Sequence, residues 1–360
     1  MNRHVRSALL LGASLLGAGC EQSTNPGTSS FVPEIQYVSP ESVTLTTRVS
    51  GVAWDPEAFF MSLATCGPTC PIPPFISEGM PLYQRSAIRG GSVSALDPTN
   101  GATVGDPSST DGVGIWVLPK VPSRNTAPYF IVSASQGALP TEQIGPPLPA
   151  IPPTQYLKTL TLRPIKTVSG SCVSMEAVHV GSTGVLQAVA KQLSSQGKPT
   201  VVSDLLDPTQ YHSVTVVGMF HAGNAALRAP AAGTGLSATS TTGSGAPVSY
   251  PVYHIDWAPP GTPPSNLRSD RGFIVSATDK SPVGFAVVLV PATLPRPAAI
   301  TYTVTDPVED AVARRPWVYM PITAPPTPGI VTFLGIQMGY QPPSIPLFQL
   351  PPPPGACVPL

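Results

Sequence analysis

The chain has little charge and no excess of either sign. Only 11% of its 360 residues are charged, and 19 Lys and Arg balance 19 Asp and Glu, so the net charge is zero. A surface that binds nucleic acid needs a surplus of basic side chains to neutralise phosphates. We therefore expect no nucleic-acid partner.

Long helices and long apolar runs are also missing. The 48 prolines and 32 glycines interrupt helices, because proline removes a backbone donor and glycine costs conformational entropy. The apolar run 283–294 is broken by Pro291, and a membrane-spanning helix needs about 20 apolar residues. Yet 42% of the residues are hydrophobic, too many for a disordered chain, and they fall in short β-rich runs. The sequence predicts a mainly β protein with two β-sandwich-like domains, one short helix in the second domain and long proline-rich loops.

The motifs of several enzyme classes are absent. The chain contains no GxSxG elbow, HExxH zinc motif, P-loop or GxGxxG dinucleotide motif. We expect neither catalysis nor a cofactor. One alternative stays open, namely an envelope enzyme or metal-binding protein that uses histidines of the second domain or the two cysteines of the segment CGPTC.

The first stretch of the chain has the pattern of a secretion signal. Arg3 and Arg6 precede an apolar segment that ends in small residues, and this segment is about half as long as a membrane-spanning helix. Residues 1–19 are thus predicted to be a signal peptide. The ending LGAGC at Cys20 resembles the lipobox of bacterial lipoproteins, although that family usually has Leu where this chain has Gly17. An ordinary cleaved signal peptide with a chance cysteine nearby is the alternative.

The resemblance to lipoproteins implies where the mature protein resides. In that family the cysteine carries a diacylglyceryl group and becomes an acylated N-terminus, which would anchor Cys20 permanently because two acyl chains suffice. Glu21 follows the cysteine, and a residue other than Asp there implies sorting to the outer membrane. We expect an outer-membrane or cell-surface protein whose residues 20–33 form a lipidated, flexible tether.

Residues 34–166 are predicted to form the first sandwich. Their strand and turn motifs resemble the carboxypeptidase regulatory-like, or transthyretin-like, β-sandwich family, whose members are typically noncatalytic modules. The matching segments are a Ser-Gly turn, a VSAxD strand, a TDxxG turn before an aromatic strand, an LPxVP exit and a YxVxAS strand. They lie at Ser50-Gly51, Val93–Asp97, Thr110–Gly112 with Trp116, Leu118–Pro122 and Tyr129–Ser135.

Residues 167–340 are predicted to form a second β-rich domain with one helix at 183–196. Val185, Val189 and Leu193 give that helix an apolar stripe. The segments FIVSAT and VGFAVVLV predict a β-hairpin, and the Gly- and Ser-rich stretch 233–245 predicts a loop. Residues 341–360 form a proline-rich tail.

Four cysteines remain once Cys20 carries lipid. In an exported protein an even set predicts disulfides, and three connectivities are possible. We favour a local Cys66–Cys70 bond and a Cys172–Cys357 bond that closes the second half of the chain. Three residues separate Cys66 from Cys70, whereas a redox motif has two.

No metal site is predicted, but four side chains are weak candidates. His254 and Asp256 share one face if they lie in a strand, and His179 or His221 on a neighbouring strand would complete a ligand set. Taken together, the sequence predicts a lipid-anchored envelope protein with a noncatalytic binding or structural role. Its expected partners are the membrane, through the N-terminal lipid, and an envelope protein or a glycan.

Overall fold

The computed structural model describes residues 45–66, 84–124, 127–144, 148–165, 167, 172–221, 233–241, 245–262, 267–305, 317–318 and 321–340. Contacts divide the chain into two units, Met1–Val43 and Thr44–Leu360, and everything below concerns the second. The predicted signal peptide, Cys20, the tether and the tail 341–360 lie outside the described residues. None of the described helices is both long enough and apolar enough to cross a membrane.

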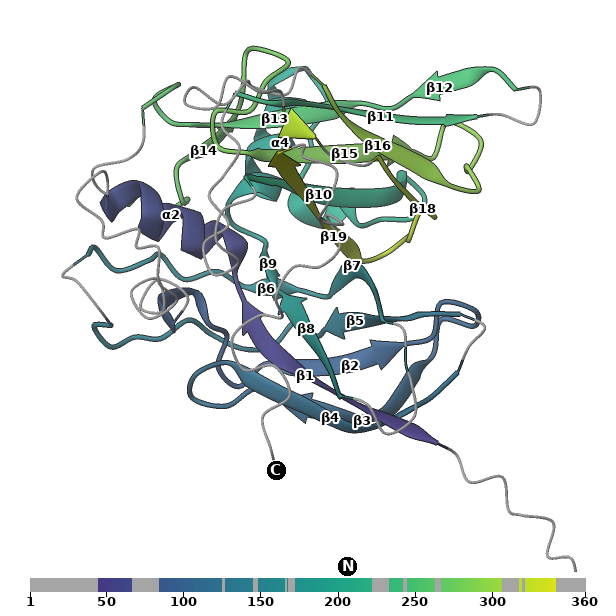
Figure 1. The fold of residues 1–360 in the computed structure, drawn as a ribbon. Coiled ribbons are helices and arrows are strands. Elements are labelled where there is room, and N and C mark those ends of the chain that lie inside the picture. The colour runs from purple at the N-terminus through teal and green to yellow at the C-terminus, as the bar shows by residue number, and fades with distance from the viewer. Residues whose placement is uncertain are drawn as a thin grey trace, which may run out of the picture. The chain divides into compact units, whose positions relative to one another are not determined.

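The fold is mainly β, as predicted, and its first part is a two-sheet sandwich (Figure 1). One sheet has the order β4-β1-β8, and the facing strands run β7-β5-β2-β3. Buried apolar side chains from both layers, among them Trp116 and Ile131, form one core. The strands are β1 (Thr46–Trp54), β2 (Ser92–Leu96), β3 (Thr103–Ser109), β4 (Ile115–Pro122), β5 (Tyr129–Ser133), β7 (Thr159–Ile165) and β8 (Cys172–Val178).

Strands β1 and β8 pair in parallel, and this pairing needs a glycine. Gly51 lies opposite Met175 in the register, and a Cβ atom built on Gly51 would lie 1.6 Å from the carbonyl oxygen of Met175. The sequence pattern predicts a turn at Ser50 and Gly51. This prediction is wrong, because both residues lie within β1. The glycine therefore permits close approach of two backbones rather than a change of direction.

One long sheet runs through both expected domains. Its order is β14-β13-β15-β10-β19-β7-β5-β2-β3, and the link is a short parallel pairing of residues 331–333 with 159–161. Strand β8, which follows the expected boundary near residue 166, pairs with β1 of the first sandwich. That boundary consequently does not separate two sheets.

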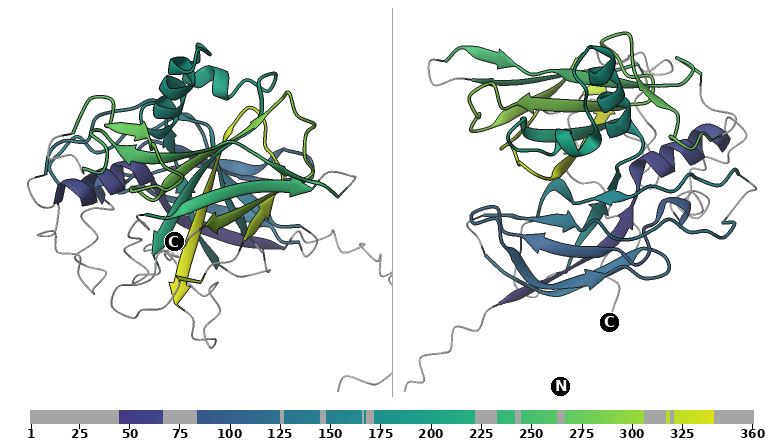
Figure 2. Two further views of the ribbon diagram at one scale, coloured as in Figure 1. Left: turned by 90° about the horizontal axis from the view of Figure 1, so that it is seen from above. Right: turned by 180° about the vertical axis from the view of Figure 1, so that it is seen from behind.

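The second half of the long sheet is covered on both faces. One face packs against the four-stranded sheet β12-β11-β16-β18, and the other packs against helices α2, α4 and α5 (Figure 2). Burial on both sides explains why the sequence of β15, FAVVLVP, is a continuous apolar run rather than an alternating one. The strands here are β10 (Tyr211–His221), β11 (Gly235–Thr241), β12 (Pro247–Ser249), β13 (Val252–Trp257), β14 (Phe273–Val275), β15 (Phe285–Pro291), β16 (Ile300–Thr305), β17 (Trp317–Val318), β18 (Ile322–Ala324) and β19 (Val331–Tyr340).

The predicted helix in the second half is present as α4 (Val185–Ser195), and its apolar stripe is buried. Two further helices, α2 (Pro56–Cys66) and α5 (Val202–Leu205), were not predicted. The start of α2 has a local signal, since Asp55 accepts a hydrogen bond from the backbone N–H of Ala58 (3.0 Å) and Pro56 occupies the first turn. Its first two turns are buried on all sides, so the helix lacks the polar face that periodicity detects.

Two local predictions in the second half are wrong. The expected hairpin does not form, because β13 lies between β14 and β15 and pairs with both. The expected loop 233–245 contains strand β11, which pairs with β16. A short two-stranded pairing of β6 (Tyr156–Leu157) with β9 (Val180–Gly181) completes the described sheets.

The close approach at Gly51 yields a stability prediction. Gly51→Ala places a methyl group against the carbonyl of Met175, and we expect it to lower the free energy of unfolding by about 2 kcal/mol or more. Gly112→Ala is the matched control, because a Cβ there meets nothing within 4 Å. Chemical denaturation measures both. Equal stability of the two variants would contradict the β1–β8 pairing.

Candidate functional site

The most highly charged part of the interior is a cluster around Arg271. Nη1 of Arg271 lies 2.7 Å from Oδ2 of Asp55 and 3.1 Å from Oε2 of Glu57, and none of the three side chains is more than 1% exposed. Nη2 of Arg271 donates to the backbone oxygen of Pro152 (3.4 Å). Sequence analysis missed this cluster, because no motif joins residue 271 to residues 55 and 57.

Asp55 connects the cluster to helix α2 and to strand β6. Its Oδ1 accepts the N–H of Ala58 in the first turn of α2, while its Oδ2 accepts the hydroxyl of Tyr156 at 2.9 Å. Its backbone N–H donates to the carbonyl of Ser86 at 2.8 Å. This carboxylate therefore begins a helix and orients a tyrosine as well as balancing Arg271.

Glu57 connects the cluster to helix α4. Its Oε1 accepts the N–H of Val185 (3.2 Å) at the start of α4, where no side chain of the helix's own cap residue, Gly184, can do so. A Cβ atom on Gly184 would lie 1.8 Å from Oε2 of Glu57. Gly184 therefore leaves the space that the carboxyl group of Glu57 occupies. That carboxyl group in turn accepts a helix-terminal N–H that would be costly to bury without a partner.

Burial decides the protonation of the cluster. It raises the pKa of Glu57 to about 8, against the opposing field of Arg271. Burial disfavours the charge of Arg271, but Asp55 and Glu57 outweigh it and the pKa of Arg271 is raised. With Glu57 protonated near neutral pH, one guanidinium balances one carboxylate. This charge balance suits a site from which water is excluded.

His179 lies beside the cluster but is not bound to it. Its ring meets the ring of Tyr156 edge to face at a centroid distance of 5.6 Å. Neither ring nitrogen has a hydrogen-bond partner among the described residues, and burial lowers the pKa of His179 to about 4. His179 is thus a neutral ring within the core.

The other weak metal candidates do not join His179. Nε2 of His254 accepts the N–H of Leu236 at 2.8 Å, and Oδ1 of Asp256 accepts the N–H of Trp257 and of Gly261 at 2.6 and 2.9 Å. In the part of the chain that the structure describes, no three His, Cys, Asp or Glu side chains are close enough to hold a metal ion.

The cysteine predictions stay open. Cys66 is the last residue of α2, and Cys172 begins β8 at an exposed position. Cys70 and Cys357 lie outside the described residues. The pairings Cys66–Cys70 and Cys172–Cys357 therefore remain predictions.

A cavity of about 320 Å³ lies next to the cluster. Tyr156 belongs to both, because its ring lines the cavity while its hydroxyl donates to Asp55. The remaining lining comes from Arg85 and from the proline-containing segments 138–143 and 150–154. Its volume is at the low end of the 300–1,000 Å³ range that is usual for ligand pockets.

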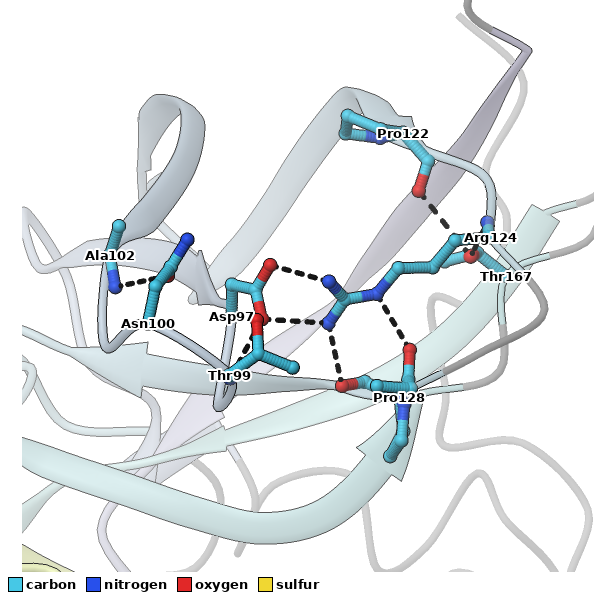
Figure 3. Close-up of polar contacts among 9 residues, drawn as sticks. Asp97, Thr99, Asn100, Ala102, Pro122, Arg124, Pro128 and Thr167 are labelled. Carbon is cyan, nitrogen blue, oxygen red and sulfur yellow. Dashed lines mark hydrogen bonds and ion pairs between the residues drawn. The ribbon is translucent and has the colours of Figure 1, made fainter.

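A second ion pair holds the loops at one end of the first sandwich (Figure 3). Arg124 forms a bidentate pair with Asp97, and its guanidinium stacks on the ring of Tyr129 at 3.9 Å. Oγ1 of Thr167 accepts the N–H of Arg124 at 3.0 Å. The hydrogen bonds from Arg124 and Thr99 hold the pKa of Asp97 well below its usual range. Since every one of these polar groups is used within the loops, we assign this pair a structural role.

Comparisons with known proteins add little. No family model matches the chain, and no curated protein matches it. Among solved structures, a streptococcal ancillary pilin is similar at 9% identity and a TM-score of 0.19, over 84% of this chain and 64% of the pilin chain. A candidate adhesin from Bacteroides ovatus is similar at 6% identity and a TM-score of 0.19, over 75% of this chain and 74% of that one. A likeness at this level carries no argument about function.

Removing Arg271 tests the importance of the cluster. Arg271→Met leaves Asp55 without its buried partner, and we expect a loss of about 3–5 kcal/mol in the free energy of unfolding. Arg268→Met removes a largely exposed partner of Asp270 and should cost no more than about 1 kcal/mol. Denaturant titration compares the two. Similar small losses would mean that the cluster is not a structural centre.

The pKa of Glu57 predicts a pH dependence of stability. Because the folded-state pKa is raised from 4.5 to about 8, the folded chain binds this proton more tightly than the unfolded chain does. The contribution of protonated Glu57 to the free energy of unfolding is therefore fully present below pH 4.5 and is lost as the pH rises toward 8.

Glu57→Gln should remove this loss, so that its unfolding free energy declines less than that of the wild type between pH 5 and pH 8. Glu142→Gln is the control, because Arg89 lowers the pKa of that exposed carboxyl group. Denaturation at a series of pH values measures the difference. Parallel profiles for the wild type and Glu57→Gln would contradict the assignment.

Proposed function

We propose that this chain is a lipid-anchored protein of the outer membrane or cell surface with a noncatalytic binding role. Cys20 would carry the lipid anchor. It follows an apolar stretch that is too short to span a membrane. An envelope enzyme or metal carrier is the alternative, although no three His, Cys, Asp or Glu side chains of the described residues could hold a metal ion.

One observation carries the noncatalytic part of the proposal. The most highly charged interior groups, Asp55, Glu57 and Arg271, face one another and are at most 1% exposed. A catalytic acid or base must come within hydrogen-bond reach of the reacting group. These side chains hold two helices and a tyrosine in place instead, which is a structural use of charge.

Binding is favoured over a scaffold role by the surface that the structure describes. Large exposed hydrophobic side chains occur there only singly, at Leu45, Val113 and Val201. A structural subunit of a larger complex would be expected to present a broad apolar patch. A small cavity beside a rigid cluster instead suits a ligand.

The anchor is tested by replacing Cys20. Cys20→Ala removes the sulfur that would carry lipid, so we expect the protein to leave the membrane fraction or to remain unprocessed at its full length. Membrane fractionation and mass spectrometry of the N-terminal peptide measure both results. Ser23→Ala, in the predicted tether, is the matched control and should retain the anchor. Unchanged membrane retention of Cys20→Ala would overturn this part of the proposal.

A further inference from the structure

The cavity beside Tyr156 contains a buried cation with one free donor. Arg85 lines it and is only 6% exposed. Its Nε donates to Oγ of Ser62 at 3.3 Å and its Nη2 to the carbonyl of Pro149 at 2.6 Å. In the part of the chain that the structure describes, no hydrogen bond is found for its Nη1, and no carboxylate pairs with it. Burial lowers the pKa of Arg85, which shows that its charge is poorly solvated there.

Three other polar residues of the lining already have partners. Glu142 is paired with Arg89, and Oγ1 of Thr154 accepts the N–H of Thr183 at 3.0 Å. The hydroxyl of Tyr156 is used by Asp55, so Tyr156 presents its ring to the cavity. Arg85 thus provides a positive charge that forms no ion pair with a carboxylate of the described residues.

Most of the remaining lining is apolar, although Thr141 and Gln143 also belong to it. Leu139 and Ile151 contribute aliphatic side chains, and Pro140 and Pro153 contribute rigid rings. A ligand that fits must therefore combine an apolar body with one negatively charged end. A carboxylate suits Nη1 of this guanidinium group, because a hydrogen bond between two ionised groups is roughly twice as strong as one between neutral groups.

We propose that this cavity binds a small organic carboxylate with an apolar body, its carboxylate on Nη1 of Arg85 and its body against Leu139, Ile151 and the ring of Tyr156. The carboxyl-terminal residue of a peptide has the same chemistry. This inference rests on the proposed binding role and names its ligand class.

Calorimetric titration of the full chain, purified in detergent, tests the proposal with 3-phenylpropionate as the probe. The uncharged 3-phenylpropionamide is the matched control ligand and also reveals any partition into detergent. We expect saturable binding of the acid and binding of the amide that is weaker by about tenfold or more, since the amide lacks the charge. Equal binding of the two ligands, or no saturable binding of the acid, would overturn the proposal.

Two variants locate the site. Arg85→Gln should weaken binding of the acid by about tenfold or more. Ala150→Trp should abolish binding by filling the cavity from its exposed rim, without removing a hydrogen bond of Arg85. Val201→Trp, at a side chain that is 60% exposed and outside the lining, is the control. If Ala150→Trp and Val201→Trp bind the acid equally well, the cavity is not the site.

Acetyl-Leu-Phe with a free carboxyl end, compared with its amide, distinguishes the two sources of the carboxylate. Tighter binding of the peptide acid than of 3-phenylpropionate supports recognition of a chain end, and weaker binding supports a free small acid. Membrane retention of the same variants, measured separately, should be unchanged. If the unaltered protein does not bind the acid saturably while its membrane retention is intact, the ligand class is refuted and the anchor still stands.

Discussion

The ion pair between Arg271 and Asp55, shared with Glu57, is the interaction on which most of the architecture depends. It brings Arg271 to Glu57, which is 214 residues away in the chain, and places these groups where water cannot solvate them. A buried charge without its partner costs far more than the pair itself contributes. The start of α2, the start of α4 and the orientation of Tyr156 are all specified by the same three side chains. The position of each element therefore constrains the others.

The buried cluster has a structural role, and the proposed binding role belongs to the cavity beside it. The charges of the cluster pair with one another. The adjacent cavity presents another guanidinium group, that of Arg85, for whose Nη1 no hydrogen bond is found among the described residues. Tyr156 stands between the two, with its hydroxyl fixed by Asp55 and its ring facing the cavity. A rigid wall of this kind lowers the entropic cost of binding, because little has to be ordered when the ligand enters.

Local pattern was a good guide to the strands and to the helix at 185–195, and a poor guide to their partners. The Gly, Ser and Thr residues of β11 resemble linker sequence and predicted a loop, although they form an inner strand between β12 and β16. The expected hairpin failed because β13, which precedes both segments in the chain, inserts between them. Helix α2 was missed because burial on every side removes the periodicity that marks an amphipathic helix. Of the candidate site, the sequence indicated only His179, which proved to be a core side chain beside the cluster.

The sequence by itself determined the fold class, the places of most strands and the presence of a helix at α4 with its apolar stripe, because each depends on the character of neighbouring residues. It also bears the lipobox-like stretch at Cys20, which stays a prediction. Only the tertiary structure decided that β8 pairs with β1, that β19 joins β7, and that Arg271 meets Asp55 and Glu57. Those contacts link positions that lie far apart in the chain. Their stability comes from close approach and from exclusion of water, and neither can be read from any local segment.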